Sequence, residues 1–119
     1  MRLKTYATAK ISGCRVTGAE LEYQGSVTLG ENLLAWSGVE ELELVHINNL
    51  ETGAHWETYV IKGENTEVCL NGPPANLFEV GDRVVIVRYE QLDEHPGAIQ
   101  LVRFLEGRLE SAERKEILP

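Results

Sequence analysis

Apolar and polar residues alternate in short runs along the chain, and this period of two is typical of β-strands with one buried face. The run at 83–89 has the strongest β-branched character. Six to seven strands with turn signals roughly every 8 to 12 residues favour a small, mainly β protein, a closed or nearly closed β-barrel. The predicted strands occupy residues 3–11, 19–23 with a resumption at 27–29, 41–48, 56–62, 66–70, 83–89 and 99–105.

Glycine and proline mark the ends of these elements. Glu31–Ser37 stands between two glycines and is predicted to form a short helix. A turn near Thr52-Gly53 joins two strands into a hairpin, and Asn71-Gly72-Pro73-Pro74 is predicted to be a second turn, because proline donates no backbone hydrogen bond. The charged tail, Gly107–Pro119, is expected to fray or to form a loose helix.

Composition indicates one domain over residues 1–119, with enough apolar residues, 43%, for a single core. The formal charge of −8 argues against a nucleic-acid partner, because phosphate binding requires clustered lysine and arginine. The longest apolar run, Val84–Val87, is far too short to span a membrane, and the N-terminal residues lack the apolar stretch of a secretory signal. We therefore expect a cytoplasmic protein with neither a nucleic-acid nor a membrane partner.

The cysteines and histidines predict no metal site. Cys14 and Cys69 lie far apart without zinc-ligand spacing, and we interpret both as reduced thiols. The histidines are isolated in the sequence: His46 is predicted to have a structural role within a strand, and His95 to be solvated in a loop. No phosphate-binding glycine loop or Gly-x-Ser-x-Gly motif is present.

One dipeptide has a chemistry of its own. Gly25-Ser26 interrupts strand-like sequence, and a seryl hydroxyl can attack the carbonyl before it when the backbone is held in a strained geometry. The amide then becomes an ester, elimination gives dehydroalanine, and hydrolysis leaves a new chain that begins with a pyruvoyl group. Taken alone the dipeptide is a weak signal, because most Gly-Ser pairs are ordinary turns.

Five separated motifs carry a resemblance to the pyruvoyl-dependent aspartate α-decarboxylases. The segment Lys10–Ser26 resembles the N-terminal region of that family, and Leu33–Gly38 its short helix. Thr58-Tyr59 resembles its catalytic pair, Asn71-Gly72 its Asn-Gly loop and Val80–Asp82 the start of its late hairpin. The motifs occur in order over about residues 3–90.

The resemblance implies a double-psi β-barrel that assembles as a homotetramer, with active sites between subunits. It also implies self-cleavage into residues 1–25 and 26–119, with Ser26 becoming a covalently bound pyruvoyl cofactor. That ketone would act as an electron sink for decarboxylation of a small amino acid. The implied reaction converts L-aspartate to β-alanine and CO2 for pantothenate biosynthesis.

The resemblance also assigns roles to single residues. Ser26 and Tyr59 would be catalytic, with Tyr59 returning a proton to the decarboxylated carbon. Thr58 would polarise the Gly25 carbonyl during self-cleavage and later contact substrate, and Tyr23 belongs to the cleavage motif. Thr58-Tyr59 is equally good as ordinary strand sequence.

The implied substrate pocket contains residues from other parts of the chain. Lys10 would supply a positive charge for a carboxylate, although an exposed strand lysine is its plain alternative. Asn71 and Gly72 would form the pocket wall with polar and backbone contacts.

Three positions depart from the family pattern. His55 stands where the family carries a carboxylate-binding arginine, and imidazole lacks the bidentate fork of guanidinium. Ser12 replaces a histidine found near the cleavage site in many members. Pro73 and Pro74 replace two alanines of the substrate-binding loop and remove two backbone donors.

These departures leave two alternatives open. A paralogue that decarboxylates a less acidic L-amino acid is one, because a fixed charge and two donors are lost. An unprocessed, non-catalytic barrel that binds a ligand or partner is the other. The need for a maturation factor is also open.

Overall fold

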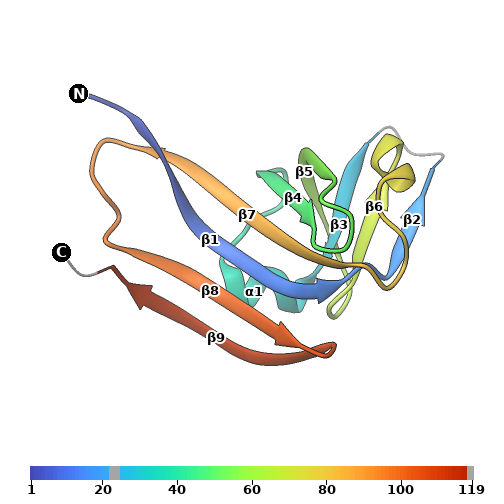
Figure 1. Ribbon diagram of the computed structural model, residues 1–119. Coiled ribbons are helices and arrows are strands. Elements are labelled where there is room, and N and C mark those ends of the chain that lie inside the picture. The colour runs from blue at the N-terminus through green and yellow to red at the C-terminus, as the bar shows by residue number, and fades with distance from the viewer. Residues whose placement is uncertain (22–24, 118–119) are drawn as a thin grey trace.

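The computed structural model describes residues 1–21 and 25–117, and within these ranges the chain is almost entirely β-structure (Figure 1). A short helix, α1 (Glu31–Ser37), and a 3-10 turn, η1 (Pro73–Asn76), complete it. The strands are β1 (Lys4–Arg15), β2 (Gly18–Glu20), β3 (Ser26–Gly30), β4 (Leu44–Asn49), β5 (His55–Gly63), β6 (Val68–Asn71), β7 (Arg83–Leu92), β8 (Ala98–Leu105) and β9 (Arg108–Glu116).

The nine strands form one sheet in the order β2-β6-β3-β5-β4-β7-β1-β8-β9. β1 lies between β7 and β8, and the chain that follows it reaches the opposite end of the sheet. At its C-terminal end, Thr17 donates its backbone N–H to the Val68 carbonyl (2.8 Å), and β2 then pairs with β6. The chain thereby curls the sheet around a common core, and the prediction of a small, mainly β barrel is confirmed. The run predicted at 19–29 is two strands, since β2 and β3 pair with opposite edges of β6.

The prediction for the tail is wrong, which makes nine strands in the described part of the chain rather than six to seven. Residues 108–116 form β9, antiparallel to β8, after a turn in which Glu106 and Gly107 both have positive φ. Charged side chains are typical of edge strands because they discourage pairing with other chains. The charged residues that suit a solvated edge strand therefore hide the apolar–polar alternation of β9 in the sequence.

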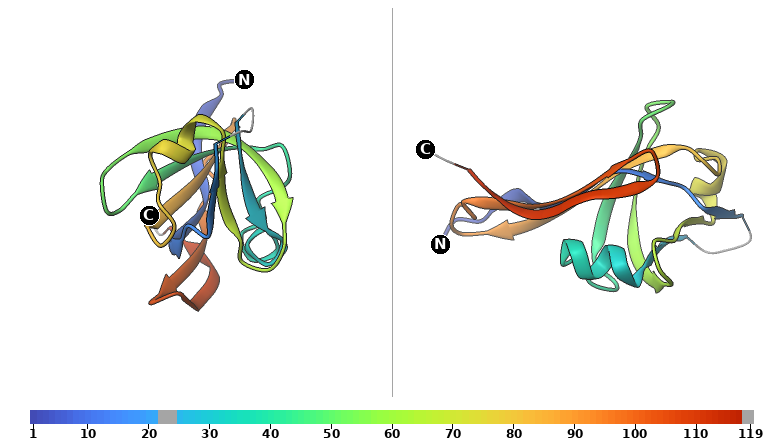
Figure 2. Two further views of the ribbon diagram at one scale, coloured as in Figure 1. Left: turned by 90° about the vertical axis from the view of Figure 1, so that its right-hand side faces the viewer. Right: turned by 90° about the horizontal axis from the view of Figure 1, so that it is seen from below.

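The outer strands extend beyond the barrel as an arm. Figure 2 shows β8 and β9 projecting with the ends of β1 and β7 away from the compact part that contains β3, β5 and β6. The molecule measures 43 × 31 × 26 Å. No helix in residues 1–21 and 25–117 has the length and apolar character needed to cross a bilayer.

A glycine sets the C-terminal end of the helix. Gly38 ends α1 in the left-handed conformation (φ 79°), and its N–H donates to the Leu34 carbonyl. Leu33 is the helix side chain that enters the core. The predicted bounds of the helix are confirmed.

The core is formed by aliphatic residues of the strands together with one aromatic ring, that of Phe78, which is 1% exposed. Replacing Phe78 by Ala is expected to lower the free energy of unfolding by about 3–5 kcal/mol, since it removes a buried ring and leaves a cavity. Urea unfolding measures the loss. Leu77→Ala is the matched control, because the neighbouring Leu77 is 39% exposed and its truncation should cost far less. Equal losses for the two variants would contradict the packing described.

Candidate active site

Ser26 begins β3 with its hydroxyl group buried, and the side chain of Asn71 holds it. The two residues are register partners in the antiparallel β3–β6 pair. Asn71 Nδ2 donates to Ser26 Oγ and to Thr28 Oγ1, both at 2.9 Å, while Asn71 Oδ1 accepts from Cys69 Sγ at 3.4 Å. Ser26 is only 3% exposed. The seryl oxygen, in the residue that follows Gly25, is therefore held by the Asn71 amide.

Gly25 has φ +116°, a conformation that side-chain-bearing residues rarely adopt. Among the residues that the structure describes, a Cβ at this position would meet the Pro73 ring at 4.0 Å, an ordinary contact distance. The backbone conformation itself requires glycine at the predicted cleavage point. Tyr23, the other predicted cleavage residue, lies outside the described residues.

The structure places Thr58 and Tyr59 on β5, the parallel neighbour of β3. Val27 pairs with Val60, so Ser26 and Tyr59 each immediately precede one member of that pair. Alternation along β5 then separates the two side chains: Thr58 is 8% exposed on the inner face, and Tyr59 is 41% exposed on the outer face. β5 thus places both residues near Ser26 along the sheet, with the side chains of Thr58 and Tyr59 on opposite faces.

The backbone groups of Gly72, in the loop after Asn71, form hydrogen bonds within the chain. The Gly72 N–H donates to the Glu20 carbonyl at 2.7 Å, and the Gly72 carbonyl accepts from the Ala75 N–H at 3.0 Å. Pro73 and Pro74 begin η1, where a helix leaves N–H groups without partners in any case. The predicted backbone contact from Gly72 to substrate is therefore already occupied within the chain.

Asn71→Ala is expected to slow self-cleavage by about 10-fold or more, because the variant loses the donor that fixes Ser26 Oγ. Gel analysis of freshly purified protein over a warm incubation measures the rate. Thr28→Val is the control: it removes the other oxygen bound by Asn71 and leaves the bond to Ser26 intact. Cleavage of Asn71→Ala at the wild-type rate would contradict this role for the amide.

Lys10 lies on β1, which is not a neighbour of β3 in the sheet order. In the sheet order β5, β4 and β7 stand between β3 and β1, which carries Lys10. Lys10 and Ser12 instead line a cavity of about 460 Å3 together with residues of β8 and the C-terminal segment, among them Glu110 and Lys115. The two positions that the family resemblance placed at the active site thus line one cavity.

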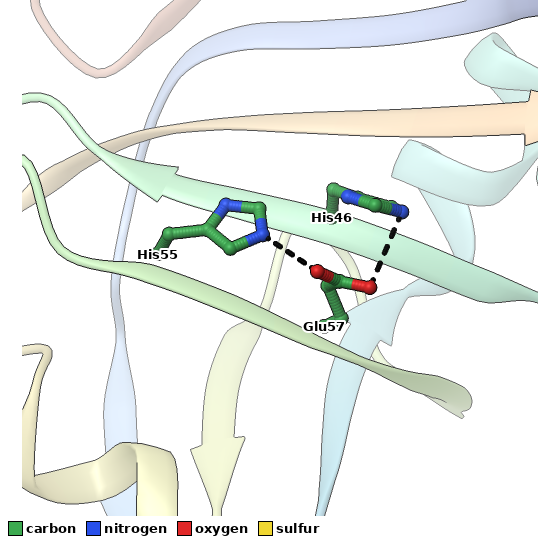
Figure 3. A group of neighbouring side chains, drawn as sticks. All are labelled: His46, His55 and Glu57. Carbon is green, nitrogen blue, oxygen red and sulfur yellow. Dashed lines mark hydrogen bonds and ion pairs between the residues drawn. The ribbon is translucent and has the colours of Figure 1, made fainter.

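His55 begins β5 in a hydrogen-bonded cluster, and the prediction of isolated histidines is wrong for His46 and His55. His55 Nδ1 donates to Asn48 Oδ1 at 2.7 Å, and His55 Nε2 lies 3.0 Å from Glu57 Oε2. His46 Nε2 lies 3.6 Å from Glu57 Oε1, and the centroids of the two imidazole rings are 5.4 Å apart. Figure 3 shows the Glu57 carboxylate between the two rings.

The electrostatics of this cluster favour an ionised carboxylate. The hydrogen bond with His55, then the charge of His46, lower the pKa of Glu57. The sequence carries a signal for the cluster in the β4–β5 hairpin, where His46 is the register partner of Glu57. That register, once worked out, places both histidines and Glu57 on one face.

Cys14 and Cys69 are both buried and free. Burial raises the pKa of Cys14 to about 12, so this thiol stays protonated and unreactive. Burial, followed by the nearby Glu67 and Glu20 charges, also raises the pKa of Cys69. Neither cysteine is bridged.

Comparison with known proteins identifies the family. The model of the aspartate decarboxylase family matches residues 1–103. Aspartate 1-decarboxylase of Exiguobacterium sibiricum is 46% identical over 92 residues, 76% of this chain and 72% of that protein. The enzymes of the same name from Pyrobaculum islandicum (41% over 99 residues, 83% and 82% of the two chains) and Cytophaga hutchinsonii (49% over 87 residues, 71% and 76%) are similarly related. The chain with the buried serine after a left-handed glycine therefore belongs to the aspartate decarboxylase family, a family of carboxy-lyases.

Proposed function

We propose that the chain is a self-processing decarboxylase that converts L-aspartate to β-alanine and CO2, the step that supplies β-alanine for pantothenate biosynthesis. One observation carries the proposal: a buried seryl hydroxyl, held by Asn71, follows a glycine whose φ of +116° suits a strained peptide bond. The printed name of the three relatives supports aspartate as the substrate.

In the proposed maturation, Ser26 Oγ attacks the Gly25 carbonyl carbon while its proton passes to the leaving nitrogen. The C–N bond breaks, and an ester replaces the amide. Loss of the Ser26 Cα proton then expels the Gly25 carboxylate and leaves dehydroalanine. Water hydrolyses this enamine and releases ammonia, so that the chain of residues 26–119 begins with a pyruvoyl group. No external oxidant or reductant is required.

The residues around Ser26 fit a pyruvoyl group made there. Such a ketone supplies an electron sink for the loss of CO2. Thr58 lies on β5, the strand that pairs with β3, and its nearly buried hydroxyl is the group we propose to polarise the Gly25 carbonyl during cleavage. Tyr59 holds a phenol O–H on the outer face, where substrate enters from solvent, and donates the proton that replaces CO2.

A homotetramer would complete the site. Because three strands separate Lys10 from Ser26 in the sheet order of one chain, a second copy is the source we propose for the lysine charge beside each Ser26.

The proposed location is the cytoplasm, in agreement with two unbridged cysteines. Self-cleavage of the purified chain without additions would show that no maturation factor is needed.

A panel of L-amino acids tests the proposed reaction. The cleaved protein is incubated with each amino acid, and the amine products are measured. We expect β-alanine from L-aspartate as the main product. His55 in place of arginine is expected to raise the KM for aspartate, since imidazole lacks the bidentate grip. A clear preference for an uncharged amino acid would refute aspartate and favour the paralogue.

A further inference from the structure

Two histidines and a glutamate form a cluster on the β4–β5 hairpin, and the proposed maturation and decarboxylation give no role to the cluster as a whole. One ligand atom from each of His46, His55 and Glu57 lies within 4.8 Å of the other two. These residues come from facing strands: His46 is the register partner of Glu57, and His55 is two residues before Glu57 on the same face. A rigid hairpin therefore holds all three.

The spacing is close to that of a zinc site. Four ligands about 2.0–2.1 Å from a zinc ion stand about 3.3–3.4 Å from one another. The separations here are 3.0 Å from His55 Nε2 to Glu57 Oε2 and 3.6 Å from His46 Nε2 to Glu57 Oε1. These two distances end on different oxygens of Glu57, and the three ligand atoms lie within 4.8 Å of one another, so side-chain rotation is needed to bring them to one ion.

The hydrogen bond of His55 prepares its other nitrogen for a cation. Asn48 Oδ1 accepts from His55 Nδ1–H at 2.7 Å, so in the neutral ring Nε2 carries a lone pair. In the protonated ring Nε2 donates to the Glu57 carboxylate at 3.0 Å, and a metal ion would take the place of that proton. Metal-binding histidines commonly donate their second N–H to a carbonyl or amide oxygen in this way.

We propose that His46 Nε2, His55 Nε2 and the Glu57 carboxylate bind one divalent transition-metal ion of the zinc class, with water as the fourth ligand. Two imidazoles and one carboxylate are the donors that such ions prefer. Solvent reaches the site, since the three side chains are 26%, 44% and 50% exposed, and this leaves room for the water. With two neutral imidazoles and one carboxylate, a bound divalent ion would give the site a net charge of about +1.

The site lies on the outer face of β5, the face that also carries Tyr59. A zinc ion there would put positive charge back on the surface where the family's arginine stands. The inference itself does not depend on the proposed decarboxylase activity, because metal binding is measured without substrate.

Isothermal titration of the purified protein with Zn²⁺ tests the proposal, with Co²⁺ as a spectroscopic probe. We expect one Zn²⁺ per chain, with Kd well below millimolar, and the visible absorption of four-coordinate Co²⁺. His46→Gln, His55→Gln and Glu57→Gln should each weaken binding at least about 10-fold, and Asn48→Ala by about 10-fold through the lost orientation of His55.

His95→Gln is the matched control, since His95 is the remaining histidine of the chain, an exposed loop residue whose Nδ1 accepts from the Gly97 N–H. It should bind Zn²⁺ as the wild type does. In case a variant fails to fold, NMR of the wild-type imidazoles gives the same answer: Zn²⁺ should shift His46 and His55 and leave His95 unchanged. Binding no tighter than millimolar, full binding by Glu57→Gln, or a shift at His95 alone would overturn the proposal and leave the cluster an ion pair.

Discussion

Ser26→Ala is expected to leave the protein as one uncut chain of 13.3 kDa without decarboxylase activity. The variant lacks the oxygen that attacks Gly25, so no pyruvoyl group forms. Losing the electron sink should reduce the rate by at least about 10⁶-fold, the low end of enzymatic acceleration. The fold should persist, because Asn71 Nδ2 keeps Thr28 as an acceptor. Denaturing mass spectrometry and product analysis measure the two effects.

Ser37→Ala is the matched control for this variant. Ser37 is as buried as Ser26, at 1% exposure, and accepts a hydrogen bond from the Val39 N–H. Its loss should cost about 1 kcal/mol of stability and leave cleavage intact. Cleavage of Ser26→Ala, or equal loss of cleavage in both variants, would contradict the assignment of Ser26 as the nucleophile.

Tyr59→Phe is expected to cleave normally and to lose about 10²–10⁴-fold in kcat. The reason is that the ring and its packing remain while the proton donor is gone. Steady-state rates of β-alanine formation from the fully cleaved variant measure the loss, and KM should change little.

Tyr89→Phe serves as the control for loss of a phenol at equal exposure, since Tyr89 is 42% exposed and Tyr59 41%. Tyr89 lies on β7, two strands from β5 in the sheet, and its variant should keep wild-type kcat. An unchanged kcat for Tyr59→Phe would remove Tyr59 as the proton donor and leave the residue a member of the strand.

The local structure could be predicted from the sequence because its causes are local. Period-two alternation located eight of the nine described strands, with β2 and β3 merged into one run, and two flanking glycines gave the bounds of α1. The strand β9 could not be found in this way. Its pairing with β8 stabilises residues whose charged side chains, considered alone, are typical of a solvated tail.

Only those parts of the site that are formed by residues adjacent in the sequence could be predicted. Gly25 and Ser26 are adjacent, and the motif drew attention to them. The hydrogen bond from Asn71 to Ser26 joins residues 45 positions apart, and it depends on the order of β6 and β3 in the sheet. The same holds for Lys10, whose separation from Ser26 follows from three intervening strands that no local pattern reveals.

Mass spectrometry of the denatured wild-type chain tests the central claim most directly. After warm incubation and borohydride treatment, we predict two fragments, residues 1–25 and 26–119, with the larger carrying one reduced carbonyl at its first residue. An uncut 13.3 kDa chain with no carbonyl that borohydride reduces would contradict the account.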